Sequence, residues 1–317
     1  MIDAPLGPAP PRVTRARYLL HFRAADRLRL PPYPGATFRG ALGTAWRAST
    51  CTTGAPDCDG CPRRDRCPFG LTWERLVTGP EVPNRASSPP RPYVFRFESP
   101  PGGALAPGAA LSFEMMLFGS ARAYAPTWVL AAQRLADLGL TADRVPVHLV
   151  RVESAQGPPL WTVGEGFARF DAAACEAIAP TPLGDGPARV RLRFLTPLAL
   201  KSQGRIGAFA PAAFTARLAD RLSAMAHLYD DAPVDWDVKG LLALADSVKV
   251  LDNQAQETTF ERFSNRMRAK VPMRGLLGEV VVDDVHPALL GLWRCAEAVH
   301  VGKNATFGFG RVEVDAF

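Results

Sequence analysis

The chain has 317 residues, of which 47% are hydrophobic and 21% charged, and its formal net charge is +6. This length suffices for two domains with separate cores. No apolar run reaches the roughly 20 residues that span a bilayer, and residues 1–15 lack the apolar core of a secretory signal, which argues against membrane and secreted classes. We therefore expect a cytoplasmic protein without a membrane partner, and the positive charge favours a polyanionic partner.

The first half of the chain predicts alternating strands and helices after a proline-rich, disordered lead-in at residues 1–14. Period-two alternation of apolar side chains predicts strands, and apolar residues three or four positions apart predict helices. The expected strands are 17–22, 92–98, 111–119 and 146–154, and the expected helices are 37–49 and 126–139.

Four cysteines follow the first expected helix in the pattern C-x6-C-x2-C-x5-C, and they are Cys51, Cys58, Cys61 and Cys67. Four thiolates this close can bind one tetrahedral zinc ion, and the C-x2-C step is typical of a zinc knuckle. Disulfides are the alternative, which a cytoplasmic location disfavours. We therefore predict one structural zinc ion in a knuckle at residues 50–70. Because four protein ligands close such a site, no catalytic metal is expected.

A Gly- and Pro-rich stretch at residues 179–188 is expected to link this half to a second half that repeats the pattern. The expected strands there are 189–195, 278–283 and 309–314, and the expected helices are 211–229 and 286–300. Each half orders strand, helix, two or more strands, helix and strand, which is the split βαβ pattern. The sequence predicts an α+β protein with two tandem ferredoxin-like (RRM-like) domains, at residues 15–178 and 189–317. Four-stranded sheets of this kind often bind RNA.

Basic residues are concentrated in two segments. Eight arginines lie between residues 12 and 47 against one acid, Asp26, and the segment 262–274 holds five basic residues and no acid. Guanidinium groups suit bidentate phosphate contacts, and solvated surface charges are the alternative. The candidates for phosphate contacts are Lys201, Arg205, Arg262, Arg266, Arg268, Lys270, Arg274 and Lys303.

Four stretches together resemble one family: "LPPYPGATFRGALG" before the cysteines, "VRLRFLTPLALKSQGR", "ERFSNRMRAKVPMRGLLGEVVV" and "HVGKNATFGFGRVEV". They are similar to the CRISPR-associated endoribonucleases that process precursor crRNA, a branch of the RAMP superfamily, and in particular to those with a cysteine knuckle and a C-terminal glycine-rich loop. The resemblance covers most of residues 17–317 and is strongest from 189 onward. It implies two ferredoxin-like RAMP domains that bind CRISPR repeat RNA. It also implies metal-independent cleavage of precursor crRNA, in which a 2′-hydroxyl attacks the adjacent phosphate and leaves a 2′,3′-cyclic phosphate.

Such cleavage needs a base for the hydroxyl, an acid for the leaving oxygen and cations for the phosphorane. Of the five histidines, His300 is the first candidate for proton transfer because it directly precedes the glycine-rich loop, and Lys303 is the candidate cation. An RNA-contacting or structural role is the alternative for His300. His21 is the second candidate, although His21 and His148 both lie inside expected strands, where a structural role is favoured.

The glycines of the terminal loop remove side-chain bulk, so that backbone N–H groups can face an RNA phosphate. We therefore include Gly302, Gly308 and Gly310 among the expected RNA-binding residues. The loop is not a nucleotide-binding P-loop, because Lys303 is followed by Asn304 rather than by Ser or Thr. No nucleotide cofactor is expected.

One departure from the family leaves the activity open. Many members carry a catalytic histidine near the first helix, whereas residues 36–50 hold none, and Thr44 stands at mid-helix. A non-catalytic RAMP subunit that binds crRNA beside other subunits of a CRISPR effector complex is therefore the second hypothesis. A zinc-knuckle nucleic-acid protein unrelated to CRISPR is the third.

Overall fold

The computed structural model describes residues 6–74, 89–98, 103–155, 159–168, 175–202, 205–264 and 269–317. Two compact units make up this part of the chain. The N-terminal unit comprises the described residues of Thr14–Gly79 and Ala86–Glu176, and the C-terminal unit comprises those of Met1–Val13 and Ala177–Phe317. None of the helices in these ranges is long and apolar enough to cross a membrane.

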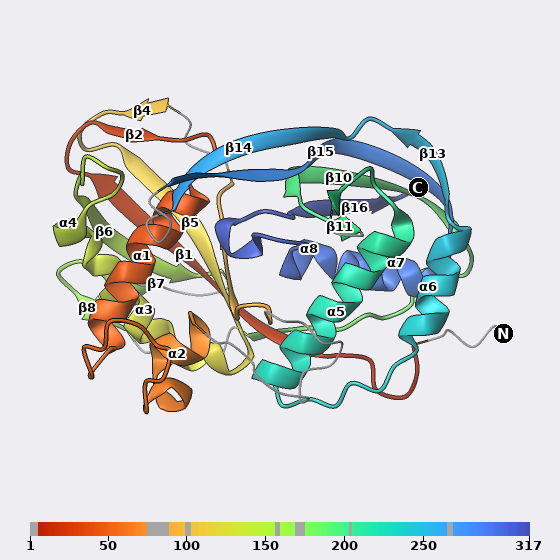
Figure 1. Cartoon of the computed structure of the whole chain (residues 1–317), viewed down its shortest axis with the longest axis horizontal. Helices are drawn as coiled ribbons and strands as arrows, with labels where there is room; N and C mark the ends of the chain where they lie inside the picture. Colours follow the sequence, from red (N-terminus) through yellow and green to blue (C-terminus); the bar gives the residue numbers. More distant parts are fainter. Residues whose placement is uncertain are drawn as a thin grey trace. The chain divides into compact units, whose positions relative to one another are not determined.

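The N-terminal unit is an antiparallel sheet whose strands follow the order β3-β5-β1-β6-β7-β8, with β9 paired to β1. Figure 1 labels β1, β5, β6, β7 and β8 of this sheet. Its main strands are β1 (Val13–Ala24), β3 (Tyr93–Arg96), β5 (Ala110–Phe118), β6 (Val147–Ser154), β7 (Pro159–Thr162), β8 (Gly166–Phe167) and β9 (Cys175–Ile178). A separate pair is formed by β2 (Leu28–Leu30) and β4 (Gly103–Leu105). Its helical segments are α1 (Gly35–Thr50), η1 (Arg64–Arg66), α2 (Pro68–Thr72), η3 (Gly119–Tyr124), α3 (Ala125–Gln133) and α4 (Leu135–Leu138). The run β3-β5-β1-β6 is the strand order of a ferredoxin-like domain.

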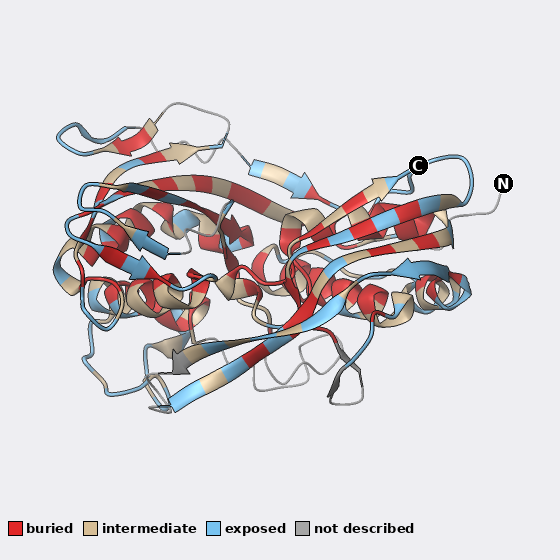
Figure 2. Ribbon diagram, turned by 90° about the horizontal axis from the view of Figure 1, so that it is seen from above, coloured by how far each residue is buried: buried red, intermediate tan, exposed pale blue. Residues whose placement is uncertain are grey.

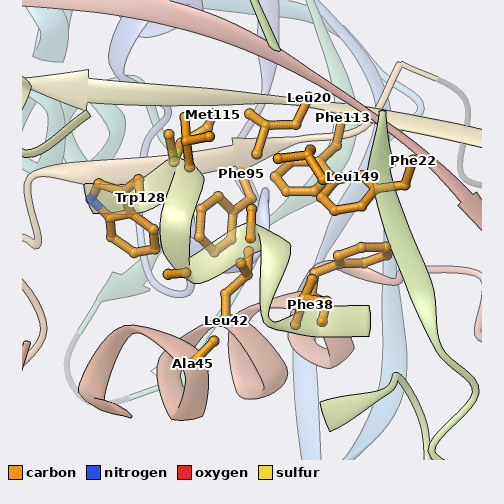
Figure 3. Packing of buried hydrophobic residues seen from close by; sticks show 14 of the residues in the cluster. Leu20, Phe22, Phe38, Leu42, Ala45, Phe95, Phe113, Met115, Trp128 and Leu149 are labelled. Atoms are coloured by element: carbon orange, nitrogen blue, oxygen red, sulfur yellow. The ribbon is translucent and has the colours of Figure 1, made fainter. Parts of the chain in front are cut away.

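The core of this unit forms where α1 packs on one face of the sheet (Figure 3). Phe38, Leu42 and Ala45 recur at helical spacing, so all three lie on the same side of α1 and are buried. The ring of Phe38 meets that of Phe113 from β5 at a centroid distance of 5.0 Å. Phe113 in turn contacts Phe95 from β3 at 5.5 Å. Because this face is filled by apolar side chains, the polar residues of β1, β5 and β6 stand on the opposite face of the sheet.

The C-terminal unit repeats the same strand order as β13-β15-β10-β16, with β14 added to β15. Its strands are β10 (Ala188–Leu198), β11 (Lys201–Ser202), β12 (Arg205–Ile206), β13 (Lys249–Asn253), β14 (Gln256–Ser264), β15 (Ala269–Val285) and β16 (Val312–Ala316). Its helical segments are α5 (Pro211–Tyr229), α6 (Val238–Ser247), α7 (Pro287–Arg294), α8 (Ala296–Val299) and η4 (Ala305–Phe307). Each unit is thus a ferredoxin-like domain, which confirms the predicted fold class.

Alternation of buried and exposed residues is plain along the strands of the C-terminal sheet (Figure 2). On β10, Val190, Leu192 and Phe194 are buried, whereas Arg191 and Arg193 are exposed. The apolar face meets the helices, and the charged face is left to solvent.

The segment predicted as a disordered lead-in is partly ordered from Leu6 onward. Leu6 is buried, and Ala9 and Asp235 form an isolated antiparallel bridge with N–H to O distances of 3.0 and 3.1 Å. A Cβ on Gly7 would lie 2.8 Å from the Cα of Trp236, so the backbone packs closely there. Buried Leu6 and the bridge attach residues 6–13 to the C-terminal unit. The high proline content of this segment did not indicate that attachment.

The stretch 179–188, predicted as a linker, lies against α7. The N–H of Leu183 donates to the carbonyl of Pro287 at 3.1 Å. A Cβ on Gly291 would lie 1.8 Å from the carbonyl oxygen of Thr181, so the stretch packs directly on the helix backbone.

Candidate functional site

The glycine-rich loop joins α8 to β16 and is bonded to the end of β10 and the residues that follow it. These contacts connect segments about 100 positions apart in sequence, so they fix the loop on the central strand of the C-terminal sheet. The hydrogen bonds run from Lys303 N to Ala199 O (3.0 Å), from Gly310 N to Pro197 O (3.1 Å), from Thr196 Oγ1 to Gly308 O (2.8 Å) and from Arg311 N to Thr196 Oγ1 (2.9 Å).

The glycines of the loop serve its internal packing. Gly302 and Gly310 have φ values of +85° and +72°, which favour glycine. A Cβ on Gly302 would lie 2.6 Å from the carbonyl oxygen of Ala199, and one on Gly310 would lie 1.9 Å from that of Val301. The N–H groups of Gly308 and Gly310 donate to carbonyl groups within the protein. This corrects the expectation that these two N–H groups face an RNA phosphate.

His300 occupies the start of the loop and is completely buried. Its φ of 57° and ψ of 155° lie in a region that residues other than glycine rarely adopt. Nδ1 lies 3.0 Å from the carbonyl oxygen of Phe309, so the imidazole ties the beginning of the loop to its end. A ring without exposed surface does not reach an RNA phosphate in this conformation, and the geometry therefore favours the structural alternative for His300 over the catalytic one.

Arg221 of α5 is a buried cation that sequence analysis missed. Its Nε donates to the carbonyl oxygen of Val299 at 2.8 Å, directly before His300. Burial lowers the pKa of Arg221 to about 10. The sequence conceals this burial, because basic residues of an amphipathic helix usually lie on its exposed face.

The side chain of Lys303 is exposed, so it keeps the role of candidate phosphate contact that the sequence suggests. Its backbone N–H is bonded to the carbonyl oxygen of Ala199, so any contact with RNA at this position would come from the side chain.

The hairpin of β14 and β15 supplies the predicted basic cluster and divides it between two faces. Arg262 places its guanidinium 5.3 Å from the ring centroid of Phe307 in the glycine-rich loop. Phe260, two residues earlier, meets Phe309 of the same loop at 6.4 Å. One face of the hairpin therefore contacts the loop through aromatic and cation–π interactions.

The other face of the hairpin carries Lys270 and Arg274. Lys270 pairs with Glu261 at 3.1 Å, and Arg274 approaches Glu257 at 3.8 Å. The segment 262–274 holds no acid, but strand pairing brings acids from β14 beside it, so this part of the cluster is charge-balanced. Arg266 and Arg268 lie outside the described residues, as do the side chains of Lys201 and Arg205, whose backbones pair in β11 and β12.

Among the remaining histidines, two belong to helices of the C-terminal unit. His286 caps α7 by accepting from the N–H of Ala288 through Nδ1 at 3.1 Å, and His227 is half-buried on α5. Thr44 of α1, where the family expectation placed a histidine, is exposed and donates to the carbonyl oxygen of Gly40 at 3.3 Å.

His21 and His148 stand on the outward face of the N-terminal sheet and not on its buried face. His148 is exposed, and the side chain of His21 is 36% exposed. His21 Nε2 lies 3.1 Å from Glu153 Oε2, and Arg151 pairs with the other oxygen of the same carboxylate. Burial, and then the charge of Arg151, lower the pKa of His21. Glu153 carries no sequence signal of its own, because its partnership depends on the pairing of β1 with β6.

The four clustered cysteines line one pocket at the end of α1, together with Arg47 and Phe69. All four are free thiols. Thr53 Oγ1 lies 3.7 Å from the sulfurs of both Cys51 and Cys61. Hydrogen bonds from Thr53 lower the pKa of Cys51 to about 7. The donor chemistry suits zinc, but no three metal-binding side chains in the described ranges converge on a single point.

Comparisons with known proteins identify two family matches. Residues 13–171 match the AF_1859_N family, an N-terminal domain, and residues 192–312 match the family of the CRISPR-associated endoribonuclease Cas6. The first match spans half of the chain.

Individual relatives are distant. An uncharacterized protein of Archaeoglobus fulgidus is 29% identical over 133 residues, which cover 41% of this chain and 43% of that protein. The chain therefore spans less than half the length of the curated relative it matches.

Two solved structures share the fold. A chain of a partial Cas6-RT-Cas1–Cas2 complex has a TM-score of 0.54 at 11% identity, covering 98% of this chain and 47% of its own. A Cas6 product complex of a Thermus thermophilus protein has a TM-score of 0.53 at 16% identity, covering 95% of this chain and all of its own. At these identities the likeness establishes the double ferredoxin-like fold.

Proposed function

We propose that the chain, whose residues 192–312 match the family of the CRISPR-associated endoribonuclease Cas6, is a RAMP-type endoribonuclease that binds CRISPR repeat RNA and cuts precursor crRNA. The reaction is transesterification, in which a 2′-hydroxyl attacks the adjacent phosphate and the 5′-oxygen leaves. Its products are a 2′,3′-cyclic phosphate and a 5′-hydroxyl, and no metal ion takes part.

The observation that carries this proposal is the match of residues 192–312 to the endoribonuclease family. That range contains the loop that holds Lys303 and the hairpin that holds Arg262, and the two elements touch. Positive charge on adjoining elements suits the RNA backbone.

The second candidate function is binding of crRNA without cleavage, as a subunit of a CRISPR effector complex. Burial of His300 favours it, because that residue is the first candidate for proton transfer. Under this alternative, other effector subunits are direct partners of the chain.

Cleavage of the repeat RNA from a neighbouring CRISPR array, in EDTA, separates the two functions. The wild-type protein is expected to give a product with a 2′,3′-cyclic phosphate, and a substrate with one 2′-deoxynucleotide at the cleavage position is expected to stay intact. Cleavage by His300→Ala is measured beside that of the wild-type protein. Tight binding without any cut product would contradict the nuclease and support the RNA-binding subunit.

We also propose that Cys51, Cys58, Cys61 and Cys67 hold one structural zinc ion. Their shared pocket and free thiols support the proposal, and zinc binding draws the four sulfurs together. Metal analysis of the purified protein is expected to find one zinc per chain, and Cys58→Ser is expected to lose it. Cys175→Ser is the matched control, because this exposed cysteine lies outside the pocket. A metal-free wild-type protein of normal stability would contradict the proposal.

We place this activity in the cytoplasm, where precursor transcripts are made. Fractionation of cells that express the protein, with the repeat RNA measured in each fraction, tests this location.

A further inference from the structure

We propose that His21, oriented by Glu153, is the base that takes the 2′-hydroxyl proton, and that Arg151 and Arg23 stabilise the phosphorane. This inference rests on the proposed nuclease function and assigns its chemistry to the outward face of the N-terminal sheet. The group that transfers the proton is thus a residue of β1 and not His300.

The first argument is the geometry of the carboxylate. Glu153 Oε2 lies 3.1 Å from His21 Nε2, while Oε1 of the same group pairs with Arg151. An ionised carboxylate only accepts hydrogen bonds, so a neutral His21 must carry its proton on Nε2. The lone pair is then on Nδ1, which is the atom that can accept a proton. A carboxylate that fixes the tautomer and orientation of an imidazole is a recurring device of proton-transfer sites.

The second argument is the local backbone. The pairing of β1 with β6 shifts register between His21 and Phe22: His21 faces Arg151, whereas Phe22 faces Leu149. This irregularity keeps Phe22 and Leu149 in the core and leaves His21 on the outward face beside Arg151. Bulges of this kind often redirect side chains next to active sites.

The third argument is accessibility. Of the candidates for proton transfer, His300 is completely buried, whereas the side chain of His21 is 36% exposed. A base must lie within hydrogen-bond reach of the hydroxyl. The lowered pKa of His21 also keeps its imidazole neutral, as a base requires, at neutral pH.

Cations surround this imidazole. Arg151 is directly opposite His21 on β6, and Arg23 is the next outward residue of β1 and is exposed. Both can offset the charge that develops on the phosphorane. The charged and titratable groups around His21 on the outward face are Arg17 and Arg23 of β1, Glu114 of β5, and His148, Arg151 and Glu153 of β6.

The step balances without a cofactor. Nδ1 of His21 takes the proton of the 2′-hydroxyl as the bond from O2′ to phosphorus forms and the bond from phosphorus to O5′ breaks. Water protonates the departing O5′, and the resulting hydroxide takes the proton from His21. The RNA strand is cut and the imidazole returns to its neutral form.

The test is single-turnover cleavage of the repeat RNA in EDTA as a function of pH, with RNA affinity measured in parallel. His21→Ala is expected to slow cleavage about 100-fold or more while affinity changes less than about 3-fold. Added imidazole is expected to restore part of the lost rate. His227→Ala, which removes a half-buried imidazole from α5, is the control and is expected to cut at the wild-type rate.

Two further variants separate positioning from a merely structural role. Glu153→Gln is expected to slow cleavage about 10-fold and to move the rising limb of the pH profile to lower pH, because an anion that favours imidazolium is removed. Arg151→Gln is expected to move the same limb to higher pH, because a cation that disfavours imidazolium is removed.

Outcomes that overturn the inference are distinct from those that overturn the function. Wild-type cleavage that His21→Ala retains in full would overturn this assignment alone, as would a pH limb that neither Glu153→Gln nor Arg151→Gln moves. Absence of wild-type cleavage would overturn the nuclease function together with the assignment. Loss of cleavage in His21→Ala with recovery by imidazole supports both.

Discussion

The outward faces of the two sheets can be compared directly, because β1 and β10 hold the same central position in the same strand order. On the N-terminal sheet, Glu114 has an 8% exposed side chain, accepts a hydrogen bond from Arg17 at 2.5 Å and forms an ion pair with Arg96 at 3.0 Å. On the C-terminal sheet, Arg193 is 45% exposed and reaches Glu313 at 2.8 Å and Asp315 at 2.7 Å. The carboxylate of Glu114 is thus buried among its partners, whereas the ion pairs of Arg193 lie in water.

This difference changes how much the charged residues of each face contribute to the stability of the protein. Ion pairs in water contribute little to stability, whereas a buried charge becomes costly as soon as its partner is removed. The C-terminal face also lacks the stacked aromatic residues of RNA-binding sheets along its described central strand, where Arg191 and Arg193 point outward. We therefore expect substitutions on the N-terminal face to have the larger effects.

The largest expected effect is that of Glu114→Ala. The change leaves Arg17 and Arg96 without their shared carboxylate, and we expect the free energy of unfolding to fall by about 3 kcal/mol. The matched change on the other sheet is Glu313→Ala. Urea denaturation measures the free energy of unfolding of the two variants side by side. Equal losses in the two variants would show that the faces do not differ in this respect.

A smaller effect is expected from the pH dependence of stability. Because the pKa of His21 is lower in the folded chain than in the unfolded one, the unfolded state binds a proton more readily. Stability is therefore expected to fall as pH decreases through the range just below the ordinary histidine value of about 6.5. The urea midpoint of the wild type should drop more between neutral and mildly acidic pH than that of His21→Gln. Parallel curves for the two proteins would argue against a lowered pKa.

The smallest effect is expected from Arg193→Ala. Its partners Glu313 and Asp315 stay hydrated, so the free energy of unfolding should change by less than about 0.5 kcal/mol. Thermal unfolding in low salt and in 1 M NaCl (about 3 Å screening length) should show the same small difference. A loss of stability comparable with that of Glu114→Ala would show that the two faces do not differ in their contribution to stability.

The elements with strong periodicity were predicted well. The helix expected at 211–229 coincides with α5, because Pro211 starts it and Leu218, Leu222 and Met225 form a regular buried stripe. Elements without an apolar pattern were missed: β14 reads QETTFERFS, and it exists because β15 pairs with it along its whole length. The strand expected at 278–283 is accordingly only part of the 17 residues of β15.

The candidate site was predicted less well than the fold. The sequence indicates the glycine-rich loop but not that Gly302 and Gly310 pack closely against Ala199 and Val301. The position of His300 beside the loop also does not reveal that its ring is buried. The pairing of His21 with Glu153 depends on cross-strand register over 132 positions, which no local pattern contains.

The bridge between Ala9 and Asp235 has a consequence for biosynthesis. The ribosome makes Leu6 and Ala9 early, but their binding surface emerges roughly 220 residues later, which is about 10–45 s at ordinary elongation rates. The first strand of the C-terminal sheet is β10, and one of its edges likewise stays unpaired until β16 has been synthesised. The N-terminal unit is complete before either event, so the nascent chain carries one folded unit while the apolar start of the other is still exposed to chaperones and proteases.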